Sequence, residues 1–290
     1  PIYTGGVAAD LTQAGQDGNR WGLNKTISFA GSGELDNGWT ISVSQSLSDG
    51  NSTGLGMTLD MGDAGKISFT DAAGGIGIAG IDDLMPTAVE EVWDGLGGTK
   101  NGYVSQASSG FEYTNTSVDG VKVEIAYGMS QAPSDDGGVA GTGSLRSSES
   151  IAIQYTGIEG ANIFFGTGTL GESATTDTDV DTMGATYSMG AATVGIQVSK
   201  VDPAASAEEE NTQYGISFAV NDDLSLSYGV HKSDQSKQNG TSVELEGSSI
   251  QLAYSMGGAS LKVAETSVDN GNYDSATDKD ATTIALTLAF

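Results

Sequence analysis

Residues 224–231 read LSLSYGVH, in which Leu224, Leu226, Tyr228 and Val230 alternate with small or polar residues. A repeat of two residues puts the apolar side chains on one face of a strand and the others on the opposite face. The same alternation recurs from end to end of the chain, most clearly at 214–220, 250–256 and 284–290, and helical periodicity is nearly absent. The sequence therefore predicts an all-β protein. The strands alone fit a soluble sandwich as well as a wide membrane barrel.

Short and long connections alternate between these strands. Seven tight links, each with Gly, Asn or Asp suited to a close turn, fall at 35–38, 61–65, 117–120, 157–161, 189–191, 221–223 and 256–259. Eight mostly longer links fall at 10–19, 48–52, 74–102, 131–147, 171–181, 202–211, 233–243 and 270–279. Together these fifteen links imply sixteen strands, with every tight turn on one side. Closing such a sheet removes its exposed edges and leaves an aqueous channel. We therefore predict a 16-stranded antiparallel transmembrane β-barrel, with residues 1–290 forming a single domain.

The charge balance narrows the class of partner. Asp and Glu number 38 against 11 Lys and Arg, a formal net charge of −27. So strong a negative field argues against a nucleic-acid partner and favours cations. The chain has no cysteine, and no apolar run reaches the 18 residues that a transmembrane helix needs. It begins at Pro1, from which we expect a mature or trimmed product.

The longest stretch without strand alternation is 74–102, which reads GGIGIAGIDDLMPTAVEEVWDGLGGTKNG. An excursion of about 30 residues in such a meander is seldom a passive connector. We predict that it folds into the barrel and narrows it. Its apolar side (Leu84, Met85, Val89, Val92 and Trp93) would lie against the wall, and its carboxylates (Asp82, Asp83, Glu90, Glu91 and Asp94) would face a water-filled lumen. The alternative is an acidic surface loop with one helical turn after Pro86.

The whole chain resembles the trimeric general porins of Gram-negative bacteria, most closely the alphaproteobacterial type. The resemblance is carried by the alternating strands, the long loop between the fifth and sixth strands, and Phe290 at the end of an apolar-alternating last strand. It implies a homotrimer in the cell outer membrane, in contact with lipid and lipopolysaccharide. It also implies that 74–102 forms the pore constriction, and that Phe290 is presented to the assembly machinery of that membrane.

One departure from the family concerns arginine. Such porins usually oppose the acidic third loop with a cluster of arginines on the wall, whereas this chain has only Arg20 and Arg146. Alternation predicts that Arg20 points inward, and the direction of Arg146 stays open. We therefore expect a net negative constriction made by Asp82, Asp83, Glu90, Glu91, Asp94, Arg20 and Arg146.

Other candidate sites are weaker. Parity points Lys66, Lys122, Lys262, Glu34, Glu112 and Glu124 inward, as ordinary solvated lining residues. The acidic pairs Asp82–Asp83 and Asp135–Asp136 and the run Glu208–Glu210 offer oxygen ligands for incidental Ca²⁺, without EF-hand spacing. The single histidine, His231, has no marked nucleophile or orienting acid and is predicted to face the lumen. No motif for a cofactor or for catalysis appears, so we expect no enzyme and no cofactor.

These observations predict an outer-membrane porin, a water-filled channel for passive diffusion of small hydrophilic solutes and ions, with a bias towards cations. A substrate-selective outer-membrane channel is the nearest alternative. A soluble extracellular all-β binding protein and a barrel enzyme of the outer membrane are the others.

Overall fold

The computed structural model describes residues 2–6, 20–23, 26–48, 51–70, 76–93, 96, 110–128, 147–171, 176–204, 206–236 and 243–288. These residues form strand segments and three short 3₁₀ helices. The strands are β1 (Ile2–Gly6), β2 (Arg20–Leu23), β3 (Ile27–Glu34), β4 (Thr40–Ser48), β5 (Asn51–Asp60), β6 (Lys66–Thr70), β7 (Gly110–Asn115), β8 (Val121–Gly128), β9 (Ser148–Tyr155), β10 (Ala161–Gly171), β11 (Asp177–Met189), β12 (Ala192–Pro203), β13 (Glu209–Ala219), β14 (Leu224–Gln235), β15 (Leu245–Met256), β16 (Ala259–Asp269) and β17 (Lys279–Leu288). The helices are η1 (Gly62–Ala64), η2 (Gly77–Gly80) and η3 (Gly271–Tyr273). None of the helices within these residues is long and apolar enough to span a membrane.

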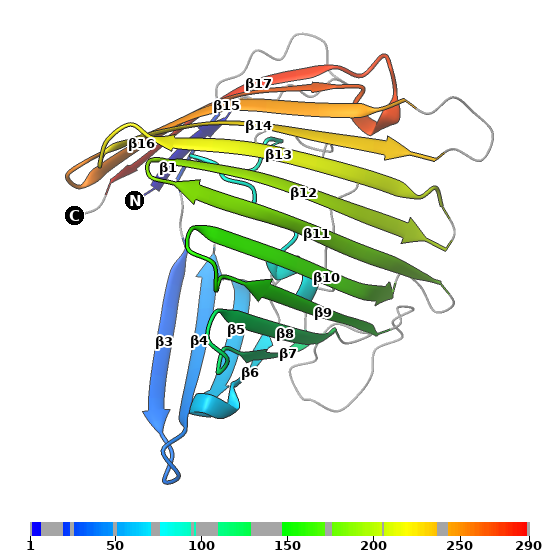
Figure 1. The fold of residues 1–290 in the computed structure, drawn as a ribbon. Coiled ribbons are helices and arrows are strands. Elements are labelled where there is room, and N and C mark those ends of the chain that lie inside the picture. The colour runs from blue at the N-terminus through cyan, green and yellow to red at the C-terminus, as the bar shows by residue number, and fades with distance from the viewer. Residues whose placement is uncertain are drawn as a thin grey trace.

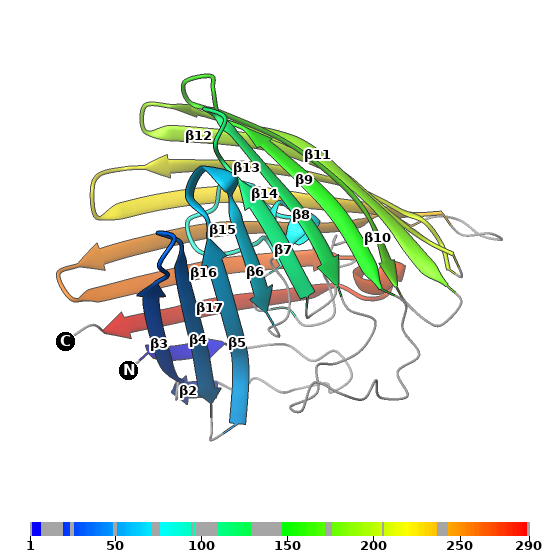
Figure 2. The same ribbon diagram turned by 90° about the horizontal axis from the view of Figure 1, so that it is seen from below.

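The strands make one antiparallel sheet in chain order. Fifteen consecutive strands, β3 to β17, each pair with the next, as the strongly curved wall in Figures 1 and 2 shows. β1 pairs with β17 on one side and with β2 on the other. No paired register among the described residues joins β2 to β3, so the sheet is not closed there. The predicted all-β antiparallel meander is confirmed.

The two faces of the sheet have opposite character. On β13 and β14, Ile216, Phe218 and Tyr228 are large apolar residues that are nearly half exposed. Their neighbours on the other face, such as Ser227 and Gln213, are polar and buried. A water-soluble protein would bury the first set and expose the second. An apolar exposed face that continues over nearly every strand indicates contact with lipid or another protein.

The tight turns lie where the sequence predicts them. They join β3 to β4, β5 to β6, β7 to β8, β9 to β10, β11 to β12, β13 to β14 and β15 to β16. Gly160 (φ +77°) and Gly190 (φ +61°) hold left-handed conformations that favour glycine. At Gly160 space is also limiting, since a Cβ there would lie 2.6 Å from the carbonyl oxygen of Ser188, whereas Gly190 has nothing within 4 Å.

These two glycines give a matched test of turn packing. Both alanine variants place a side chain at positive φ, but only Gly160→Ala also overlaps the next strand. We expect Gly160→Ala to lower the free energy of unfolding by roughly 1–3 kcal/mol more than Gly190→Ala does. Denaturant unfolding in detergent micelles, followed by tryptophan fluorescence, measures the difference. Equal midpoints would contradict the assigned close approach.

Candidate functional site

Segment 76–93 is the continuous described part of the long connection between β6 and β7, of which Leu96 is also described. Its isoleucines Ile78 and Ile81 are fully buried and pack with Phe164 of β10, Ala152 of β9 and Val180 of β11. Burial of side chains this large contributes about 1.5–3 kcal/mol each. Phe164 belongs to the polar face, since its neighbour Phe165 is exposed on the apolar one. The segment therefore lies along the polar face of the sheet.

Glycines on that face make room for the segment. Gly195, Gly215 and Gly229 stand directly opposite one another on β12, β13 and β14. A Cβ at Gly195 or Gly215 would lie 2.8 Å from Cδ of Pro86, and one at Gly229 would lie 2.5 Å from Cγ1 of Val92. Contacts this short do not occur between real side chains. The backbone of the wall is thus bare where the segment crosses it.

Two buried glutamines bind the backbone of the segment, one at residues 81–84 and the other at residues 89–90. Nε2 of Gln197 donates to the carbonyl oxygens of Ile81 (3.0 Å) and Asp82 (2.6 Å), and its Oε1 accepts from the backbone N–H of Leu84 (3.4 Å). Nε2 of Gln251 donates to the carbonyl oxygen of Glu90 (2.7 Å), and its Oε1 accepts from the N–H of Val89 (2.9 Å). Each amide thus satisfies donors and acceptors that no helix or strand satisfies.

Further polar contacts extend this attachment along the segment. The N–H groups of Gly77, Ile78 and Ala88 donate to Glu112 (2.6 Å), Ser150 (3.1 Å) and Ser227 (2.8 Å). Leu96 adds an apolar contact beyond Trp93, in a cluster with Leu245, Val268, Tyr273 and Ala281. The attachment points therefore run from β7 to β15, and the segment has a defined path across the wall.

The end of the segment covers the histidine. The rings of Trp93 and His231 meet edge to face, with centroids 5.0 Å apart, and both are buried. His231 was predicted to face the lumen, and the structure adds that Trp93 packs over its imidazole. The polar-face position of His231 on β14 does agree with the alternation of that strand.

Four of the five predicted loop carboxylates lie in the described part of the segment. Glu90 is exposed, and Asp82, Asp83 and Glu91 are half-buried. The Asp83 carboxylate turns back on its own chain, where Oδ1 accepts the N–H of Met85 (3.2 Å). Burial raises the pKa of Asp83 to about 7, and the negative charges of Glu91 and Glu90 add to the rise, while the Met85 hydrogen bond opposes it.

Several of the other predicted site residues lie outside the described part of the chain. Asp94 and Arg146 lie outside the described residues, as do Asp135, Asp136 and Phe290, and the side chain of Arg20 is likewise outside them. On the wall, Lys66 pairs with Asp60 (2.8 Å) and Lys122 pairs with Glu124 (2.7 Å). Within the described ranges no three acidic or histidine side chains come together as a metal site.

Gln197, Gln251 and the row of glycines were missed by sequence reasoning. A polar or small residue every second position is what the inward face of any such strand carries. Only their alignment across β12 to β15 distinguishes them, and that alignment depends on register. The signal in the sequence that could have predicted the crossing point is a glycine near the middle of each of three consecutive strands, at Gly195, Gly215 and Gly229.

Comparisons with known proteins agree over the whole chain. The family model described as Gram-negative porin matches residues 2–290. No curated protein sequence matches closely enough to count as a relative.

Three solved structures show the same fold. A porin structure has a TM-score of 0.71 at 16% identity, covering 100% of this chain and 98% of its own. OmpT, an outer membrane protein of Vibrio cholerae, has a TM-score of 0.71 at 12% identity, with 100% and 97% covered. An anion-selective porin from Comamonas acidovorans has a TM-score of 0.70 at 13% identity, with 100% and 96% covered. Identities this low show the fold alone.

The glutamine contacts make a testable claim about the segment. In Gln251→Leu the N–H groups of Val89 and Glu90 and the carbonyl of Glu90 lose their partner. Losing a buried partner costs about 1–3 kcal/mol. We expect hydrogen exchange across 88–91 to accelerate by about fivefold or more.

Gln213→Leu is the matched control. Gln213 is also buried on the polar face, on β13, and no hydrogen bond between the described residues joins it to the segment. Its variant should leave exchange in 88–91 near the unmodified rate. Equal acceleration in both variants would show that the effect is a general loosening of the wall.

Proposed function

Since the chain belongs to the Gram-negative porin family and is an outer-membrane channel protein, we propose that it is a passive, cation-biased diffusion pore for small hydrophilic solutes and ions. The observation that carries this proposal is the attachment of segment 76–93, with its carboxylates, across the polar face of the wall. Solutes cross down their own gradients, and no bond is made or broken.

We infer that β2 and β3 are two parts of one strand. Only residues 24–26 separate them, and Trp21, Leu23, Ile27 and Phe29 share one parity. Joining them gives sixteen strands in one domain of residues 1–290 and closes the ring, because β1 already pairs with both β17 and β2. The polar face then lines a water-filled lumen, and the apolar face meets lipid.

In that barrel, segment 76–93 is the constriction. Asp82, Asp83, Glu90 and Glu91, joined by Asp94, give the narrowest region a negative potential. Arg20 and Arg146 are the only guanidinium groups of the chain that can oppose it. Carboxylates in a confined space raise the local cation concentration and the barrier to anions.

The assembly implied by the family completes the proposal. Three copies form a homotrimer in contact with outer-membrane lipid and lipopolysaccharide, and Phe290 serves recognition by the assembly machinery. Light scattering of the detergent-solubilised protein, corrected for bound detergent, tests the count of three chains.

Charge selectivity tests the constriction directly. We expect stepwise channels in a planar bilayer and a cation-selective zero-current potential under a KCl gradient. Changing Asp82, Asp83 and Asp94 to Asn and Glu90 and Glu91 to Gln should move that potential towards zero, because the fixed charge at the narrowest point is removed. An absence of channels would contradict the proposed function.

The control removes the same charge elsewhere. Asp36, Asp119, Glu159, Asp222 and Asp223 lie in the tight turns at the other end of the strands, and the corresponding five amide substitutions should leave the potential nearly unchanged. If both variants shift the potential equally, selectivity comes from the total charge and not from the segment.

The raised pKa of Asp83 predicts a pH dependence. A carboxyl group with a pKa of about 7 is mostly neutral at pH 6 and mostly ionised at pH 8. Cation selectivity should therefore rise over this window in the unmodified protein, and the rise should be reduced in Asp83→Asn. Zero-current potentials at pH 6, 7 and 8 measure it, and an identical rise in both proteins would contradict the assignment to Asp83.

A further inference from the structure

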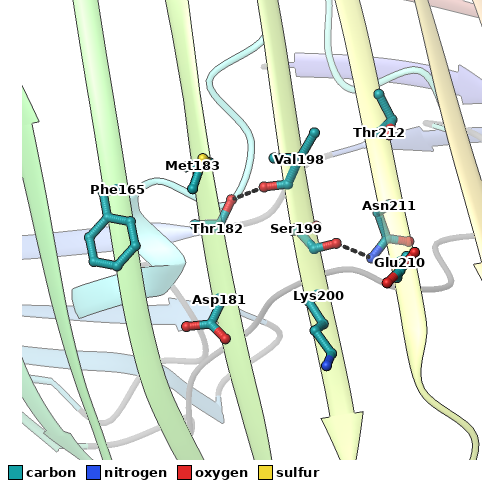
Figure 3. A pocket seen from close by; sticks show the side chains of 10 residues that line it. All are labelled: Phe165, Asp181, Thr182, Met183, Val198, Ser199, Lys200, Glu210, Asn211 and Thr212. Carbon is teal, nitrogen blue, oxygen red and sulfur yellow. Dashed lines mark hydrogen bonds between the residues drawn. The ribbon is translucent and has the colours of Figure 1, made fainter.

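A groove of about 320 Å³ lies on the outward, apolar face of the wall, across β10 to β13 (Figure 3). Its volume is within the range of about 300–1,000 Å³ typical of small-molecule sites. Exposed Phe165, Met183 and Val198 line one half, and Asp181, Lys200 and Glu210 line the other. It stands on the opposite face from segment 76–93, so it is separate from the proposed constriction.

Strand register explains why one half of the groove is apolar and the other half is charged. Phe165, Met183 and Val198 stand directly opposite one another on β10, β11 and β12. Two residues further along the strands, Asp181, Lys200 and Glu210 form the next outward row on β11, β12 and β13. Two residues span about 6.8 Å along an antiparallel strand. The groove therefore spans the edge of the apolar band. An amphiphile lying along it would place its acyl chain on the apolar row and its headgroup on the charged row.

The charged half has an excess of carboxylate. Lys200 Nζ pairs with Glu208 (2.8 Å) and lies 3.7 Å from Asp202, both outside the groove. Within the described residues Asp181 and Glu210, on either side of Lys200 in Figure 3, have no ion pair. The ammonium group of Lys200 is thus neutralised by carboxylates outside the groove. The groove therefore presents the carboxylates of Asp181 and Glu210 beside its apolar residues.

We propose that this groove binds a membrane amphiphile with a primary ammonium headgroup, of the phosphoethanolamine class. The acyl chain lies over Phe165, Met183 and Val198, and the ammonium meets Asp181 and Glu210. The assignment rests on the proposed function to the extent that the outward face meets lipid.

The test compares two lipids with identical acyl chains. The purified protein is incubated with phosphatidylethanolamine or phosphatidylglycerol, and retained lipid is counted by native mass spectrometry. We expect phosphatidylethanolamine to be retained up to about fivefold better, the upper end for one partly exposed ion pair. Asp181→Asn with Glu210→Gln should bring the ratio to about one, since the headgroup preference then has no source.

A matched control is Asp269→Asn with Asp280→Asn, which removes the same charge from exposed outward positions of β16 and β17, away from β10 to β13. It should keep the preference of the unmodified protein. Equal retention of both lipids by the unmodified protein, or the same loss in the control, would overturn the proposal. Bilayer conductance of the same preparations separates the two claims: channels without a lipid preference overturn only the groove, whereas missing channels overturn the proposed function.

Discussion

The pairing of backbone amides across strands is the constraint on which everything else depends. A strand whose outer face meets hydrocarbon has no water there to bind its N–H and C=O groups, so each must find a neighbouring strand. The unbroken pairing from β3 to β17, continued through β1 to β2, meets that requirement along this series of strands. It also leaves the other face of each strand available for polar residues.

Segment 76–93 has to be held against the polar face of the sheet. A chain crossing it cannot rely on apolar contact alone, because most of the wall there is polar. Ile78 and Ile81 pack into an apolar cluster at one end, and Trp93 packs on His231 at the other. Between them, bare glycines allow close approach and buried amides replace the water that the backbone would otherwise bind. Position and attachment thus come from the wall.

The distribution of charge follows the same division between faces. On the polar face, the carboxylates of Glu90 and Glu91 lie near that of Asp83, and burial raises the pKa of Asp83. Outside, Asp181, Lys200 and Glu210 begin where the apolar band of β10 to β13 ends. One chain with few basic residues therefore carries two acidic regions with different surroundings. One lies on the polar face of the sheet, and the other lies at the edge of the apolar face.

The sequence by itself determined the strand faces, the seven tight turns and the exceptional character of 74–102, because alternation and turn residues are local properties. Only the tertiary structure decided that Gln197 and Gln251 bind the segment, that Trp93 covers His231 and that Asp83 is partly buried. Except for the burial of Asp83, these contacts join residues more than 100 positions from each other in the sequence, such as Asp82 and Gln197. They depend on the register of many strands, and a shift of two residues keeps the alternation while moving every partner along the wall.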